Sequence, residues 1–90
     1  MTAIRIPPVL RAATDGAKHV DISGTTVREV IERLVDAYPG IADHLRAPDG
    51  ELNRFVNVFV NGTDVRHLQA LDTPVTDHDQ LVLLPAMAGG

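Results

Sequence analysis

The last ten residues of the 90-residue chain, Leu81-Val82-Leu83-Leu84-Pro85-Ala86-Met87-Ala88-Gly89-Gly90, decide how the rest of the sequence is interpreted. The unbroken apolar run at residues 81–84 predicts an interior strand, covered on one face and partly covered on the other. The two terminal glycines carry no side chain that could pack them down or shield the terminal carboxylate. A fully extended stretch from Pro85 to Gly90 spans roughly 20 Å, enough to enter another protein's cleft. We therefore interpret the upstream residues as a folded domain that carries the terminal carboxylate.

The N-terminal segment predicts a β-hairpin. In residues 3–6 and 19–22, isoleucine and valine alternate with other residues, which is the period of a half-buried strand. Two prolines at positions 7 and 8 stop the first strand, and Thr14-Asp15-Gly16 supplies turn chemistry between the two strands. We expect Val9 and Leu10 to pack on the edge of the core.

A single main helix is predicted after this hairpin. Thr26 and Glu29 have the spacing of a capping box, and an apolar stripe at helical spacing follows them. The stripe consists of Val27, Val30, Ile31, Leu34, Val35 and Tyr38. Pro39-Gly40 ends the helix, and residues 41–45 could add one further helical turn.

Residues 55–60 alternate strictly and predict a second strand with two contrasting faces. The Asn61-Gly62 pair after it is the signal of a type I′ hairpin turn, which leads to a short strand at residues 63–65. Residues 66–76 are expected to form a loop, because Pro74 bars a central strand there. Asp77 and Asp79 are interpreted as turn chemistry before the final strand rather than as a catalytic carboxylate pair.

An apolar patch is expected on one face of the sheet. Because Asn57 shares a face with both phenylalanines, the all-valine set at positions 56, 58 and 60 is the better core face. Phe55 and Phe59 then point to the other side, joined by Val82 and Leu84. One helix covers only one face, so these residues would form a docking surface for a partner, unless the loop at 66–76 folds over them.

The composition excludes several classes of function. A chain without cysteine has no disulfide, no thiolate metal site and no cysteine nucleophile. A net charge of −4 and scattered basic residues argue against a nucleic-acid partner. The histidines lack the spacing of a metal-binding pair, so no metal site is expected. No leader or long apolar run is present, so we expect a cytoplasmic protein without membrane association.

Taken together, the pattern resembles the MoaD/ThiS family of ubiquitin-like sulfur carriers over nearly the whole chain. The resemblance rests on the N-terminal hairpin, the helix capped at Thr26, the Val60-Asn61 strand end, Asp77-His78-Asp79 before an apolar strand, and Leu84-Pro85 leading to Gly89-Gly90. The Leu-Pro-Ala-Met-Ala-Gly-Gly ending is most similar to the carriers that supply cysteine biosynthesis. Ala86 and Met87 depart from the shorter ending that is more frequent in molybdopterin synthase small subunits.

The resemblance implies an α+β, ubiquitin-like β-grasp fold, in which a mixed sheet of four to five strands packs on one main helix. The first and last strands would be parallel neighbours, with a β-grasp domain at residues 1–84 and a flexible diglycine tail at residues 85–90. The reacting group would be the carboxylate of Gly90, next to Gly89. The residues expected to bind partners are Phe55, Phe59, Val82, Leu84, Pro85, Ala86, Met87 and Ala88.

The resemblance also implies partners. An E1-like enzyme would use ATP and magnesium to adenylate the Gly90 carboxylate and convert it to a thiocarboxylate, and a sulfur-accepting synthase would consume it. Because ATP and magnesium bind the activating enzyme, no cofactor is expected on this chain, which is a co-substrate rather than an enzyme. A processing metalloprotease would be needed only if a precursor has to be trimmed.

Other interpretations stay open. Within the carriers, they are a molybdopterin synthase small subunit and a carrier for a secondary-metabolite pathway. Outside them, the chain could be a ubiquitin-like modifier joined through Gly90 to lysines of other proteins. It could also be a plain interaction domain whose diglycine end is incidental.

Overall fold

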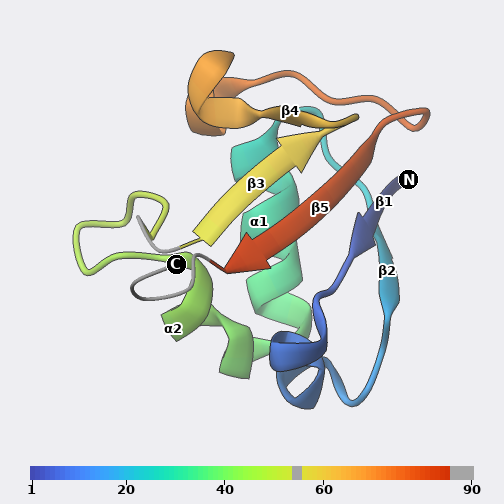
Figure 1. Ribbon diagram of the computed structural model, residues 1–90, viewed down its shortest axis with the longest axis vertical. Helices are drawn as coiled ribbons and strands as arrows, with labels where there is room; N and C mark the ends of the chain where they lie inside the picture. The colour runs from blue at the N-terminus through green and yellow to red at the C-terminus, as the bar shows by residue number, and fades with distance from the viewer. Residues whose placement is uncertain (54–55, 86–90) are drawn as a thin grey trace.

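A five-stranded mixed sheet organises the protein (Figure 1). The computed structural model describes residues 1–53 and 56–85. The strands are β1 (Thr2–Arg5), β2 (His19–Ile22), β3 (Val56–Val60), β4 (Thr63–Asp64) and β5 (Gln80–Pro85). Their order in the sheet is β2-β1-β5-β3-β4, with β1 parallel to β5 and the other neighbours antiparallel. The first and last strands are therefore parallel neighbours in the middle, which confirms the predicted β-grasp architecture.

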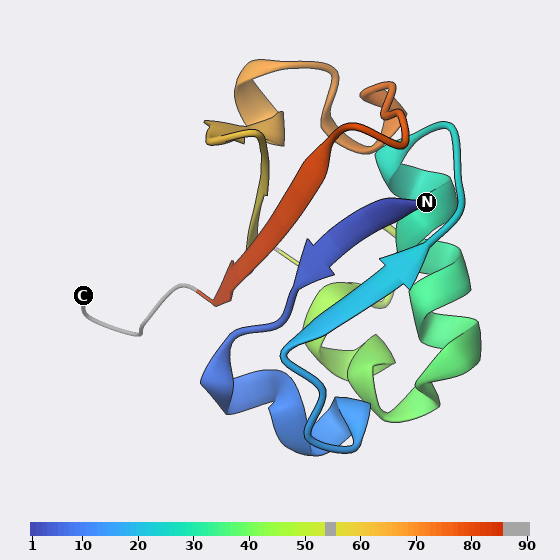
Figure 2. The same cartoon turned by 90° about the vertical axis from the view of Figure 1, so that its right-hand side faces the viewer.

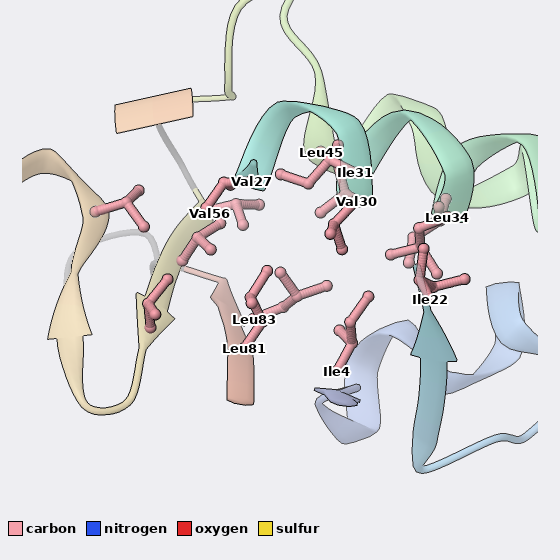
Figure 3. Packing of buried hydrophobic residues seen from close by; sticks show 14 of the residues in the cluster. Ile4, Ile22, Val27, Val30, Ile31, Leu34, Leu45, Val56, Leu81 and Leu83 are labelled. Atoms are coloured by element: carbon pink, nitrogen blue, oxygen red, sulfur yellow. The ribbon is translucent and has the colours of Figure 1, made fainter. Parts of the chain in front are cut away.

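The core lies between one face of this sheet and the helices. β5 contributes Leu81 and Leu83, which are 0% and 1% exposed. β3 contributes its three valines, as the alternation predicted, and Val58 among them is fully buried. Figure 3 shows Leu81, Leu83 and Val56 facing the main helix, in one cluster with its residues Val27, Val30, Ile31 and Leu34. Figure 2 shows the main helix on one side of the sheet, so the opposite face is left without a helix.

The main helix, α1, spans Val27–Ala37 and begins where the capping box predicts. The Thr26 hydroxyl accepts a hydrogen bond from the Glu29 backbone N–H at 3.2 Å. The Glu29 carboxylate accepts in return from the backbone N–H of Thr25 rather than of Thr26. A 3-10 turn, η2 (Pro39–Ile41), and a short helix, α2 (Ala42–Leu45), follow, so the further helical turn is also confirmed.

The N-terminal hairpin forms as predicted, but its connection is structured. A 3-10 helix, η1 (Pro8–Thr14), joins β1 to β2. Leu10 reaches the core at 3% exposure, whereas Val9 is 66% exposed, so the expectation for Val9 was wrong. Consecutive residues of such a turn point in different directions, and only one member of an apolar pair can face the core.

Apart from Arg66, which bonds to β3, the segment from residue 65 to residue 76 packs on the helix side of the fold rather than over the open face of the sheet. It contains two 3-10 turns, η3 (Val65–His67) and η4 (Ala70–Asp72), and buries Leu71 and Val75 in the core. Its Thr73 carbonyl accepts a 2.9 Å hydrogen bond from the Val27 N–H at the start of α1. The alternative in which this loop covers the apolar patch is therefore not what the structure shows.

The β3–β4 connection has the geometry that Asn61-Gly62 predicts, since both residues have positive φ angles, 51° and 89°. The Asn61 side chain also reaches the loop before β5, where it donates to Asp79 at 2.7 Å and accepts from the Gln80 N–H at 3.0 Å. None of the helices in residues 1–53 and 56–85 is long and apolar enough to span a membrane.

Candidate functional site: the open sheet face and the base of the tail

The face of the sheet opposite α1 carries three of the predicted docking residues. Phe59 and Val82 are directly opposed across the antiparallel β3–β5 pair, and both are half-buried. Leu84 is 45% exposed and lies opposite Asn57. Because opposed residues in an antiparallel pair share a face, these side chains form one surface. We call Phe59, Val82 and Leu84 the open-face patch.

The last described residue, Pro85, ends β5 beside β3. The first half of β5, Gln80–Val82, pairs with β1, whereas its pairing with β3 continues to Val56 opposite Pro85. The end of β5 is therefore held by β3, on the strand that also carries Val82 and Leu84 of the open-face patch.

Several predicted site residues lie outside the described part of the chain. These are Phe55 and the tail residues Ala86, Met87, Ala88, Gly89 and Gly90. The roles expected for them stay predictions. The structure brings together Phe59, Val82 and Leu84 on the open face and places Pro85 at the end of β5.

Arg66, which the sequence analysis did not single out, lies at the β3 end of the open face. Its guanidinium donates to the Asn57 side chain and, at 2.9 Å, to the Val56 carbonyl. The Asp64 carboxylate lies 3.9 Å from the same guanidinium. Arg66 therefore fixes a positive charge beside Phe59's strand, and only the fold reveals this, because η3 has to turn Arg66 back over β3.

A groove adjoins the patch on the β1 side of β5. It is lined by Arg5, Pro7, Pro8, Arg11, Val82, Leu83 and Leu84. Arg5 is the register partner of Val82 across the parallel β1–β5 pair. The Nε–H of Arg11 donates to the Ile6 carbonyl at 3.1 Å. Neither arginine was a predicted site residue, since their proximity to β5 depends on a strand pairing between the two ends of the chain.

Asp77 and Asp79 lie in the turn before β5 and hold it in place. The N-terminal ammonium donates to Asp77 at 2.8 Å, and this hydrogen bond, with the charge of the ammonium, lowers the pKa of the Asp77 carboxyl. The pKa of Asp79 is also lowered, first by the hydrogen bond from the Asn61 side chain and then by that from the Thr76 N–H. The Asp79 carboxylate is thus bound within the turn and the Asp77 carboxylate binds the N-terminus, which agrees with the turn interpretation.

Across residues 1–53 and 56–85, no three His, Cys, Asp or Glu side chains gather closely enough to hold a metal ion. A β-grasp sheet of this order, with one main helix on one face, defines the class of ubiquitin-like proteins.

Comparison with known proteins narrows this class. The ThiS family model matches residues 4–90. The sulfur carrier protein CysO of Mycobacterium tuberculosis is 45% identical over 89 residues, which are 97% of this chain and 96% of CysO. A chain of the Amycolatopsis orientalis BexX/CysO complex superposes with a TM-score of 0.91 at 41% identity, covering 100% of both chains. The small archaeal modifier protein 1 of Methanosarcina acetivorans matches with a TM-score of 0.88 at 29% identity, covering 99% of this chain and 95% of the modifier.

The chain belongs to the ThiS family. The relatives with the name CysO are sulfur carrier proteins, and this chain is similar to them over nearly its full length.

Proposed function

We propose that the protein is a sulfur carrier that delivers sulfur for cysteine biosynthesis through a thiocarboxylate at Gly90. The observation that carries this proposal is the near full-length identity of 45% to a sulfur carrier protein, CysO. The structure supports it with β5, which ends at Pro85, directly before the Ala-Met-Ala-Gly-Gly segment in the sequence.

The chemistry requires an activated carboxylate. A carboxylate oxygen of Gly90 attacks the α-phosphorus of ATP, the bond to the β-phosphate oxygen breaks, and pyrophosphate leaves. A sulfide-level sulfur from a donor then attacks the acyl carbon, and AMP leaves with the electron pair of the broken C–O bond. The resulting thiocarboxylate is a strong nucleophile towards an acceptor bound on a synthase.

The activating enzyme would recognise the open-face patch. Phe59, Val82 and Leu84 lie beside the start of the tail, so docking on them would aim the tail at an adjacent active site. Aromatic and aliphatic side chains at the centre of such a surface are typical anchors of an interface. The glycines suit a narrow channel, because a β-carbon there would meet the channel walls or restrict the backbone.

The test uses intact-mass spectrometry of the full chain with its activating enzyme, ATP and a sulfur source. We expect a mass increase equal to the difference between sulfur and oxygen, located at Gly90. Gly89→Ala and Gly90→Ala should fold normally but slow pyrophosphate exchange severely. Deletion of Gly90 should abolish sulfur transfer, because it shortens the tail by about 3.5 Å. Normal exchange in all three variants would contradict the proposal.

A second candidate function is protein modification, which the structural match to a small archaeal modifier protein favours. In that case Gly90 would form an isopeptide bond to lysines of other proteins, releasing AMP or an enzyme thiol. Incubation of the activating enzyme, ATP and a cell extract with labelled carrier distinguishes the two functions. Covalent conjugates that resist thiol treatment indicate a modifier, whereas a thiocarboxylate without conjugates indicates a sulfur carrier.

A further inference from the structure

The groove on the β1 side of β5 combines apolar and cationic groups. Its charged lining residues are Arg5 and Arg11, and the others are two prolines and the β5 residues Val82, Leu83 and Leu84. Figure 2 shows β1 and β5 pointing in the same direction, and Arg5 at the end of β1 is the register partner of Val82.

The groove carries positive charge, whereas the protein as a whole is negatively charged. The whole chain carries a net charge of −4. Within residues 1–53 and 56–85, neither Arg5 nor Arg11 takes part in any of the ion pairs found. On β2, the neighbour of β1, Asp21 lies opposite Ala3, while His19 lies opposite Arg5. The two guanidinium groups therefore form a local positive site in an acidic protein.

The geometry of Arg11 favours binding of a carboxylate. Its Nε–H is engaged by the Ile6 carbonyl, which holds the side chain against the turn after β1. This bond does not use the two terminal nitrogens, which are the part of the guanidinium that binds a carboxylate end-on with two parallel hydrogen bonds. An arginine that is already anchored loses less conformational entropy when it binds.

We propose that this groove docks an acidic segment of the activating enzyme, in which an apolar side chain is flanked by Asp or Glu. The proposal rests on the sulfur-carrier function and adds a recognition element to it. Val82 and Leu84 belong both to the groove and to the open-face patch, so a partner seated on the patch continues directly into the groove. The arginines then provide charge complementarity, which increases the association rate and fixes the orientation of the partner.

The test compares two double charge reversals that change the net charge equally. Arg5→Glu with Arg11→Glu alters the groove, whereas Arg28→Glu with Arg33→Glu alters exposed arginines of α1 on the other side of the sheet. The single variant Arg5→Glu serves if the double variant is unstable, since Arg5 is exposed at the end of β1. Thermal melts establish that each variant is folded.

Thiocarboxylate formation by the activating enzyme is measured at low and at high salt. We expect the groove reversal to raise the KM for the carrier by about tenfold or more at low salt with little change in kcat, and the α1 reversal to leave KM close to the wild-type value. The wild-type KM should rise with salt more steeply than that of the groove variant. Equal effects of the two reversals, or no effect of either, would overturn the proposal.

Calorimetry with the same variants measures binding to the activating enzyme directly. It therefore tests docking in the groove independently of sulfur transfer. A wild-type chain that gains no sulfur but binds through the arginines supports the groove and contradicts the proposed function. Two other occupants would overturn the proposal. The first is the protein's own tail: it occupies the groove if deletion of residues 86–90 shifts the Arg5 and Arg11 Nε–H resonances of the isolated protein. The second is another copy of the chain: it occupies the groove if sedimentation shows dimers of the wild type that Arg5→Glu dissociates.

Discussion

Leu83 and Leu84 are neighbours in β5, yet Leu83 is 1% exposed and packs in the core while Leu84 is 45% exposed on the opposite face. Because side chains alternate along a strand, the same residue type serves stability at one position and is available to a partner at the next.

This pair gives the first prediction, which concerns stability. Leu83→Ala should lower the free energy of unfolding by about 2 to 5 kcal/mol, because it leaves a cavity in the core. Leu84→Ala should change the free energy of unfolding by less than about 0.5 kcal/mol, as surface substitutions usually do. Urea denaturation of both variants measures the difference. Equal losses would mean that the two faces of β5 are covered alike.

A second prediction concerns docking on the open-face patch. Leu84→Ala and Phe59→Ala should each weaken binding of the activating enzyme by about 2 kcal/mol if they are central anchors of the interface. Phe59 is half-buried, so its variant should also lose some stability, whereas Leu84→Ala should not. Binding titrations below the melting temperature of each variant separate the two effects. Unchanged affinity of folded Leu84→Ala would remove that residue from the docking surface.

The approach of residue 24 to α1 gives a third prediction. A β-carbon at Gly24 would lie 2.7 Å from Val30 Cγ2 and 3.1 Å from the Val30 backbone nitrogen. Gly24→Ala should therefore cost about 1 to 3 kcal/mol of stability, because the start of α1 has to shift. Gly40→Ala is the matched control, since its nearest neighbour would be the Ala13 Cβ at 4.0 Å. A Gly24→Ala variant as stable as the control would contradict the predicted clash.

The fourth prediction is a pH dependence that depends on Asp79. Its folded-state pKa is lowered, so the ionised carboxylate stabilises the fold above the ordinary value of 3.8, and that contribution is lost as the pH falls through the folded-state pKa. Asp79→Asn should lower Tm at neutral pH, and its difference from the wild type should shrink as the pH falls below 3.8. Thermal melts between pH 7 and about pH 2.5 measure this. A difference that stays constant with pH would show that the carboxylate charge does not stabilise the turn.

The elements that the sequence predicted correctly have local signals. Thr26 and Glu29 mark the start of α1 within four residues of each other, and the alternation of valines in β3 separates the two faces of the strand. The 3-10 turns η1, η3 and η4 were not predicted, because their stability comes from packing on distant elements rather than from a periodic pattern. Val9 was misplaced for the same reason.

Part of the candidate site could also be predicted from the sequence. Phe59, Val82 and Leu84 could be assigned to one face because alternation fixes the face within each strand. The groove arginines could not, because the partnership of Arg5 with Val82 joins residues near opposite ends of the chain. No pattern within a short window carries that information.

The parallel pairing of β1 with β5 also governs the order of events during synthesis. β1 leaves the ribosome first, but its central neighbour is the last strand to be made, and β3 also waits for that strand. Long-range pairing of this kind delays folding until both partners are available. A chain that stops before Gln80 would expose the edges of β1 and β3 and remain a target for proteolysis. The sheet can therefore be completed only after translation has passed β5.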